Sequence, residues 1–185
     1  MPRFFDATAG EILISGVDIK KYPEATLMKR IGYVPQKGYL FAGTVRSNIL
    51  FGVNEGSIGS MKKAAKVAQA AEFINKMPEK YESKIAEGGT NVSGGQRQRL
   101  SIARALAKEP EILIFDDAFS ALDMKTDSKL REALKAVTRN TVTLIVAQRI
   151  STIRDAEQII VLDKGKIVGK GSHYELLDKC KVYLE

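Results

Sequence analysis

A short turn, Ser93-Gly94-Gly95-Gln96, opens a long helical pattern that continues through the basic run Arg97-Gln98-Arg99. Ser93 is a good helix cap, and the glycines let backbone N–H groups approach an anion closely. The positive end of the helix dipole would then face that anion. By itself the turn is ambiguous, because a plain helix cap has the same pattern.

A buried strand is predicted just after this helix. Pro110 ends the helical pattern, and the apolar residues 112–115 lead into Asp116-Asp117. Such a run is typical of a parallel strand that carries acidic groups to its C-terminal edge, where open α/β sheets bind their ligands. A second pattern, separate from the turn, therefore also points to a ligand site.

Five motifs in the same order resemble those of the ATP-binding cassette (ABC) family. Residues 92–96 resemble the signature motif, residues 112–116 the Walker B strand, and residues 120–123 the D-loop. Upstream, residues 31–36 resemble the strand and glutamine of the Q-loop, and downstream, residues 146–152 lie where the family has its switch histidine. The resemblance covers nearly the whole chain.

The P-loop string G-x-x-x-x-G-K-[ST], whose backbone and lysine bind phosphates, does not occur in the chain. Its nearest imitation, Gly169-Lys170-Gly171-Ser172, lacks the first glycine and the hydroxyl beside the lysine, so we expect a turn there. In the family, residues 2–6 would lie just past the helix that follows the P-loop. We therefore expect the C-terminal part of a nucleotide-binding domain, without its N-terminal strands and Walker A helix.

The alternation of strands and helices predicts an α/β fold with a parallel sheet. The resemblance implies the P-loop NTPase-like fold of ABC ATPases, with a helical subdomain that carries the signature. Residues 1–185 would form one partial domain, with α/β core portions at 1–54 and 106–185 and the helical subdomain at 55–105.

Periodicity and turn residues give the elements expected along the chain. Strands are predicted as a short pair within 11–19, a strand ending at Gln36, and strands at 112–115, 142–147, 159–162 and 166–168. Helices are predicted at 25–29, 43–50, 61–71, 93–107 and 174–177, with a further helix that has Leu130, Leu134 and Val137 on one face; residues 81–91 are expected to be a loop.

Composition limits the function classes. The chain has 185 residues, 44% hydrophobic and 28% charged, with a net charge of +7, which suggests an anionic partner. The basic residues are dispersed and not interleaved with aromatic ones, so no nucleic-acid partner is expected. The single Cys180 excludes an internal disulfide and fits a reducing cytoplasm. The single His173 cannot build a multi-histidine metal site, and we expect it on the surface at the start of the last helix.

The resemblance assigns roles to the acidic edge. Asp116 would hold Mg²⁺ with Gln36 as a second oxygen ligand, since Mg²⁺ takes one or two protein oxygens together with phosphate oxygens. Asp117 stands where competent members of the family have a glutamate that handles the attacking water, and Gln148 where they have a histidine. Aspartate is one methylene shorter, and glutamine has no titratable proton. We expect a degenerate site that binds ATP and hydrolyses it slowly or not at all.

In the family, two domains meet head to tail, and each ATP lies between one domain's P-loop and the other's signature. The resemblance implies that Ser93, Gly94, Gly95 and Gln96 complete a partner's site and that Asp123 reaches across the dimer. Glu87 resembles the glutamate of the exporter X-loop, and Phe41 would dock a transmembrane domain. The expected protein is an ATPase subunit of a heterodimeric exporter, at the cytoplasmic face of the cell membrane.

Two other functions stay open at this point. The chain could be a naturally short partner module that binds no ATP itself and only offers its signature. It could also belong to an ABC ATPase without membrane helices that acts on DNA or ribosomes. The X-loop resemblance and the absence of long linker segments favour the exporter.

Overall fold

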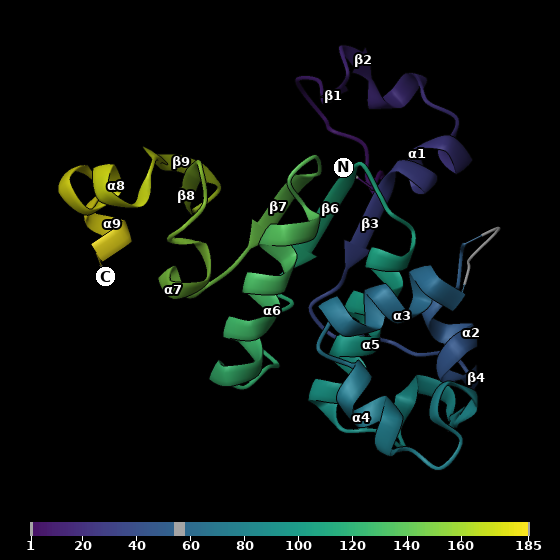
Figure 1. Ribbon diagram of the computed structural model, residues 1–185. Helices are drawn as coiled ribbons and strands as arrows, with labels where there is room; N and C mark the ends of the chain where they lie inside the picture. The colour runs from purple at the N-terminus through teal and green to yellow at the C-terminus, as the bar shows by residue number, and fades with distance from the viewer. Residues whose placement is uncertain (1, 54–57, 185) are drawn as a thin grey trace. The chain divides into compact units, whose positions relative to one another are not determined.

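The structure is a computed structural model that describes residues 2–53 and 58–184 (Figure 1). The chain divides into two compact units, Met1–Val146 and Ala147–Glu185, and each is described by itself. Among the described residues, no helix is both long and apolar enough to cross a membrane.

The first unit is built on a parallel sheet of three strands in the order β3-β6-β7 (Figure 1). The strands are β3 (Ile31–Val34), β6 (Ile112–Asp116) and β7 (Val142–Val146). Ile31 and Val142 lie opposite Ile112 on its two sides, and the register continues without a shift. The fold class predicted from the sequence is confirmed, and the three C-terminal ends lie at one edge.

One face of the sheet packs against helices. Val34, Leu113 and Phe115 alternate with residues of the other face and are buried with apolar side chains of the helices. The helices of this layer are α3 (Ile58–Val67), α5 (Gly94–Ala107) and α6 (Met124–Val137). α5 ends at Ala107 just before Pro110, and this short connection leads the chain back into the central strand β6.

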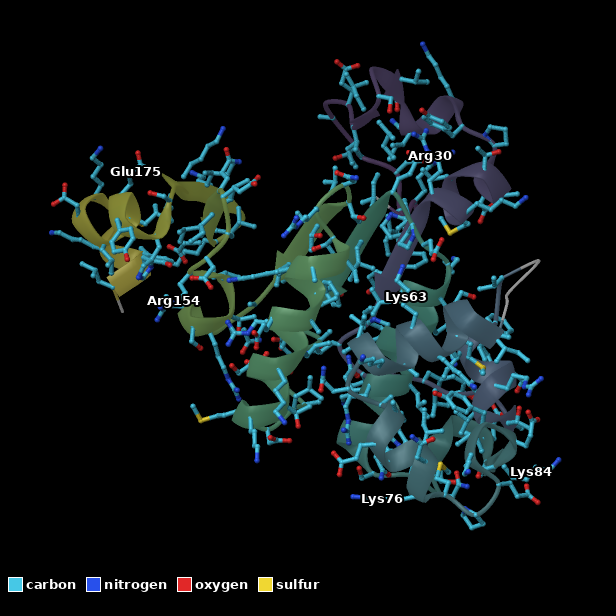
Figure 2. All side chains as sticks on the ribbon, viewed as in Figure 1. Arg30, Lys63, Lys76, Lys84, Arg154 and Glu175 are labelled. Carbon is cyan, nitrogen blue, oxygen red and sulfur yellow. The ribbon has the colours of Figure 1, made fainter. Side chains whose placement is uncertain are left out.

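The other face is covered only in part. Ile31, Ile112 and Ile114 pack under the hairpin of β1 (Leu13–Ile14) and β2 (Val17–Asp18), the 3₁₀ turn η1 (Ile19–Lys21) and α1 (Glu24–Arg30). Arg30, labelled in Figure 2, fastens this layer: its guanidinium donates to Glu111 at 2.9 and 2.5 Å and to the Tyr22 hydroxyl at 2.9 Å. On β7 the same face is open, with exposed fractions of 66% at Val142, 45% at Leu144 and 50% at Val146.

Short elements around α5 complete the first unit. They are β4 (Gly43–Thr44), α2 (Val45–Ile49), α4 (Ala71–Lys76), η2 (Lys80–Glu82), β5 (Lys84–Ile85) and η3 (Glu87–Gly89). β4 pairs antiparallel with β5. Their buried side chains join the cluster that packs on α5 and the sheet.

The second unit is a hairpin with helices. β8 (Ile159–Asp163) pairs antiparallel with β9 (Lys166–Gly171), and α7 (Ile150–Ile153), α8 (His173–Lys179) and α9 (Lys181–Leu184) accompany it. Ile159, Leu176 and Cys180 are buried together. His173 begins α8 as predicted, but α9 follows it, and the ring is half-buried with Nδ1 2.9 Å from the Tyr183 hydroxyl.

Several predicted elements need correction. The helix expected at 61–71 is two helices, because Gln69 has a φ of 55° that ends α3, and α4 begins at Ala71. The predicted turn at 169–172 is wrong: Gly169 and Gly171 belong to β9, and Ser172 caps α8. The strand expected to end at Gln36 is β3, which ends at Val34 because Pro35 follows. Val137, expected on one helix face with Leu130 and Leu134, is 37% exposed. The expected boundary between residues 54 and 55 lies outside the described residues.

Candidate functional site

Asp116 is the last residue of the buried strand β6, at the carboxyl edge of the sheet. Tyr33, one position before the end of the neighbouring strand, donates its hydroxyl to Asp116 Oδ2 at 2.9 Å. Burial, together with this hydrogen bond, raises the pKa of Tyr33. The tyrosine therefore stays protonated and orients one carboxylate oxygen.

Asp117 follows immediately and has an unusual backbone. Its φ is 46°, in the left-handed region that residues other than glycine rarely adopt. Its N–H donates to the Val146 carbonyl at 2.9 Å, and its own carbonyl accepts from the Ser120 hydroxyl at 2.8 Å. These bonds hold the Asp117 backbone in its left-handed conformation at the end of the strand, and such strained residues cluster at functional sites.

Gln36 approaches the same edge from the loop after β3. Its Nε2 donates to Asp117 Oδ2 at 3.1 Å, so the structure brings Gln36 beside Asp117. Gln36 was expected to share a cation with Asp116. With its nitrogen turned to Asp117, the Gln36 side chain keeps an oxygen available, and carboxylate and amide oxygens are the donors Mg²⁺ prefers. The residues present fit a magnesium site in their chemistry.

The turn at residues 93–96 caps α5 as the sequence predicts. Ser93 Oγ accepts from the Gln96 N–H at 3.2 Å, and Gln96 Oε1 accepts from the Ser93 N–H at 3.0 Å, which is a capping box. Within the described part of the chain, the N–H groups of Gly94 and Gly95 have no hydrogen-bond acceptor. Two backbone donors thus remain open at the positive end of a 14-residue helix.

The two glycines of this turn are not required by the chain's own packing. A Cβ added to Gly94 would come no nearer than 4.0 Å to another group, and one added to Gly95 would lie 3.6 Å from the Ala121 carbonyl, an ordinary contact. Neither glycine has a positive φ. Glycine is unfavourable in a helix, and the packing of this chain does not explain its presence here. The absence of side chains leaves room at the turn for a group outside this chain.

Asp123 is the N-cap of α6. Its two oxygens accept from Thr126, from the N–H at 2.9 Å and from the hydroxyl at 2.7 Å. These hydrogen bonds lower the pKa of Asp123. In this structure the side chain is engaged by its own helix.

Gln148 belongs to the second unit, in the segment before α7, where its side chain is exposed. Asp116 and Asp117 belong to the first unit.

An exposed aromatic surface lies near the 3₁₀ turn η3. The ring of Phe41 stacks on Phe51 with centroids 4.5 Å apart, and the Tyr39 ring meets Phe41 edge-on. Glu87 accepts from the Tyr39 hydroxyl and, at 3.0 Å, from the Ala42 N–H. The hydrogen bond from Tyr39, and to a smaller extent the one from the Ala42 N–H, lower the pKa of Glu87.

Arg104 packs against the rings of Phe41 and Phe51. Its guanidinium lies 5.1 Å from the Phe41 ring centre, and burial lowers its pKa to about 10.

A cavity of about 190 Å³ lies elsewhere, between α3, the end of α6 and the start of β6. Lys63, labelled in Figure 2, forms an ion pair with Glu109 at its lining. Leu113 and Pro110 place it toward the N-terminal end of β6, so it is separate from the edge that carries the acidic residues.

Sequence reasoning missed two side chains that organise this region. Tyr33 could have been found from strand alternation, because it faces the same side as the last residue of the neighbouring strand. Gln98 was grouped with the basic run, but it is 1% exposed and binds the loop of Gln36. No local pattern distinguishes it from a surface glutamine.

Comparisons with known proteins agree with this architecture. The family model for ABC transporters matches residues 2–120. An ABC transporter ATP-binding protein of Mycobacterium bovis is 45% identical over 186 residues, which cover 99% of this chain and 32% of the relative. The "Putative multidrug export ATP-binding/permease protein YgaD" of Bacillus subtilis is 43% identical over 178 residues, 96% of this chain and 31% of the relative.

A solved structure is also similar. It is described as a bacterial Atm1-family ABC exporter with ATP bound, and it matches with a TM-score of 0.94 and 40% identity over 99% of this chain and 32% of that one. The chain thus spans about a third of the length of the relatives it matches.

Proposed function

The chain belongs to the ABC transporter family, and we propose that it is an ATP-binding module of an exporter whose signature turn completes the ATP site of a partner domain. The observation that carries this proposal is the turn at 93–96. Its open N–H groups lie at a helix N-terminus, and its glycines leave space that the chain itself does not use. Both features suit a nucleotide phosphate held by another domain.

The acidic edge would form part of the module's own ATP site. Asp116 and Gln36 would hold Mg²⁺, with Tyr33 orienting the carboxylate. When bound, Mg²⁺ neutralises charge on phosphate oxygens. The chain's own residues place the donors: β6 fixes Asp116, and the loop after β3 presents Gln36 beside Asp117.

We propose that hydrolysis at this module's own site is slow. The Asp117 side chain is one methylene shorter than the glutamate of competent family members, which retracts the carboxylate by about 1–1.5 Å. A misplacement of about 1 Å can cost on the order of 10²-fold in rate. Gln148, in the second unit, can donate a hydrogen bond but cannot accept and release a proton as histidine does. The two changes together favour a degenerate site.

An asymmetric module needs a different partner, so we propose a heterodimer in which the second subunit supplies the P-loop, glutamate and histidine of the competent site. Asp123 would serve the dimer interface as the cap of α6 and, once released by Thr126, as a contact across it. A transmembrane domain would dock on Phe41 and its neighbours, whose rings stay exposed beside Glu87. The module would then lie at the cytoplasmic face of the cell membrane.

The experiment is MgATP-dependent association of this chain with an ABC domain that has an intact P-loop and a blocked catalytic glutamate, followed by sedimentation velocity. Ser93→Arg should abolish association, because a long cation would occupy the space of the phosphate and remove the cap. Ser172→Arg is the matched control, since Ser172 caps α8 with the same capping box. Equal association of Ser93→Arg and the control would contradict the signature role.

A further inference from the structure

Residues 97–99 of α5 connect the helix to three separate segments. Arg97 Nη1 reaches the carbonyls of η3 at 3.3 and 3.4 Å. Arg99 Nη1 donates to the Gln69 carbonyl at 2.8 Å, between α3 and α4. Gln98, between them, faces the loop after β3. The side chains of this run therefore form hydrogen bonds within the chain and connect α5 to the three segments.

Gln98 forms hydrogen bonds with backbone groups on both sides of Gln36 in the sequence. Its Oε1 accepts from the Gly38 N–H at 2.7 Å, and its Nε2 donates to the Pro35 carbonyl at 3.0 Å. Gln98 is 1% exposed, so its amide oxygen and its amide nitrogen both form hydrogen bonds where water is excluded. Loss of such buried hydrogen bonds leaves backbone groups unpaired, which is costly.

The loop also lies directly on the helix. A Cβ added to Gly38 would be 3.0 Å from Gln98 Oε1 and 3.1 Å from the Arg97 carbonyl. Gly38 has no positive φ, so glycine is needed there for close approach and not for backbone conformation. Packing and hydrogen bonding therefore attach residues 35–38 to α5.

The link from Gln36 to the acidic edge is weaker. It consists of one hydrogen bond to Asp117 at 3.1 Å, formed by an exposed side chain, against two buried bonds and close packing on α5. We propose that Gln98 is a positioning residue that fastens the loop of Gln36 to α5, so that Gln36 is placed together with the signature turn at the start of that helix. Only the consequence for ATP turnover rests on the proposed function.

The test is NMR on the ¹⁵N-labelled 185-residue chain carrying Gln98→Leu. Solvent exchange of the Gly38 amide should accelerate about 10- to 100-fold, because its acceptor is lost. The side-chain amide signals of Gln36 should move toward those of a free glutamine, while exchange in the second half of α5 stays unchanged. Gln158→Leu, the same substitution at an exposed site, is the matched control.

Gly38→Ala provides a second variant that leaves Gln98 intact. The new methyl should push the loop from the helix and move the Gln36 signals in the same direction. Unmoved Gln36 signals in both variants would overturn the proposal, as would an acceleration of exchange spread evenly over the first unit. If Gln98→Leu does not fold, Gly38→Ala decides alone.

The functional readout is ATP turnover of a full-length exporter containing this segment. Gln98→Leu should lower kcat, because the signature turn proposed to complete the partner's competent site is no longer fixed to the loop of Gln36. It should leave KM for ATP within about 2-fold, because the groups that touch nucleotide remain. A rise in KM with unchanged kcat would overturn the positioning role. If the unsubstituted exporter does not bind MgATP, the proposed function fails, whereas the exchange result still tests the role of Gln98.

Discussion

Single glycines in this chain serve two different purposes. Gly32 lies in β3, where an added Cβ would be 2.8 Å from Pro110 Cγ and 2.9 Å from Leu113 Cδ1. The fold itself requires glycine there. Gly94 has no such neighbour and no positive φ, so the folded chain would accept alanine.

This difference predicts opposite outcomes for two glycine-to-alanine substitutions. Gly32→Ala should lower the free energy of unfolding by about 1–3 kcal/mol through overpacking. Gly94→Ala should leave it unchanged or raise it slightly, because alanine favours the helix, yet it should weaken MgATP-dependent association with a partner domain. Urea unfolding and sedimentation velocity measure the two effects. A Gly94→Ala chain that associates normally would mean that the turn is only a helix cap.

How far the site could be predicted also depends on the residue. Asp116 and Ser93 follow local patterns, a strand end and a helix cap, and the structure places them as those patterns indicate. The pairing of Gln36 with Asp117 could not be predicted, because it depends on which way a loop side chain turns after two strands meet. Gln98 was missed for the same reason, since its partners are 60 and 63 residues away in sequence.

Among the helices, the cap of α6 carries a pH dependence. Hydrogen bonds from Thr126 lower the pKa of Asp123 below its ordinary value of 3.8. The charged cap therefore stabilises α6 fully above the unfolded-state pKa, and this contribution is lost as the pH falls through the lower folded-state value. α6 should become less stable in acid.

Asp123→Asn tests this, because asparagine also caps helices but does not titrate. Between about pH 6 and pH 3, a range that brackets the ordinary aspartate pKa, Tm of the unsubstituted chain should fall more than that of the variant. Glu132→Gln, at an exposed position of the same helix, serves as a control for general charge effects. A parallel fall in Tm for the unsubstituted chain and Asp123→Asn would show that the carboxylate does not stabilise the helix through its charge.

Prediction of the elements succeeded where a local signal was strong. α5 runs from a serine cap to a residue shortly before a proline, and its predicted end at Ala107 is confirmed. The helix predicted at 61–71 failed because its apolar spacing continues past Gln69, where the backbone turns left-handed and Ala70 stays buried. The turn predicted at 169–172 failed because Gly169 and Gly171 pair with Val161 and Ile159 of β8, a pairing that the local sequence does not reveal.

At the scale of the whole molecule, the open face of β7 leaves an apolar strand surface exposed. Val142, Leu144 and Val146 line one face of a strand that, among the described residues, pairs only with β6. Exposed apolar strand surfaces promote association.

We expect the isolated chain to self-associate through this face. Replacing Val142, Leu144 and Val146 with threonine keeps strand-compatible side chains and should reduce the weight-average mass in equilibrium sedimentation toward that of a monomer. Val17→Thr, on the small hairpin, is the control for removing an exposed apolar group. If the triple variant associates as strongly as the unsubstituted chain, another surface is responsible.

We propose that this module lends its signature turn to a competent site and contributes little hydrolysis at its own acidic edge. Steady-state ATP turnover of a full-length exporter that contains this segment separates the two roles when Ser93→Arg is compared with Asp117→Ala. Ser93→Arg should abolish turnover, whereas Asp117→Ala should leave most of it. Loss of turnover in Asp117→Ala, or full turnover in Ser93→Arg, would refute this division of roles.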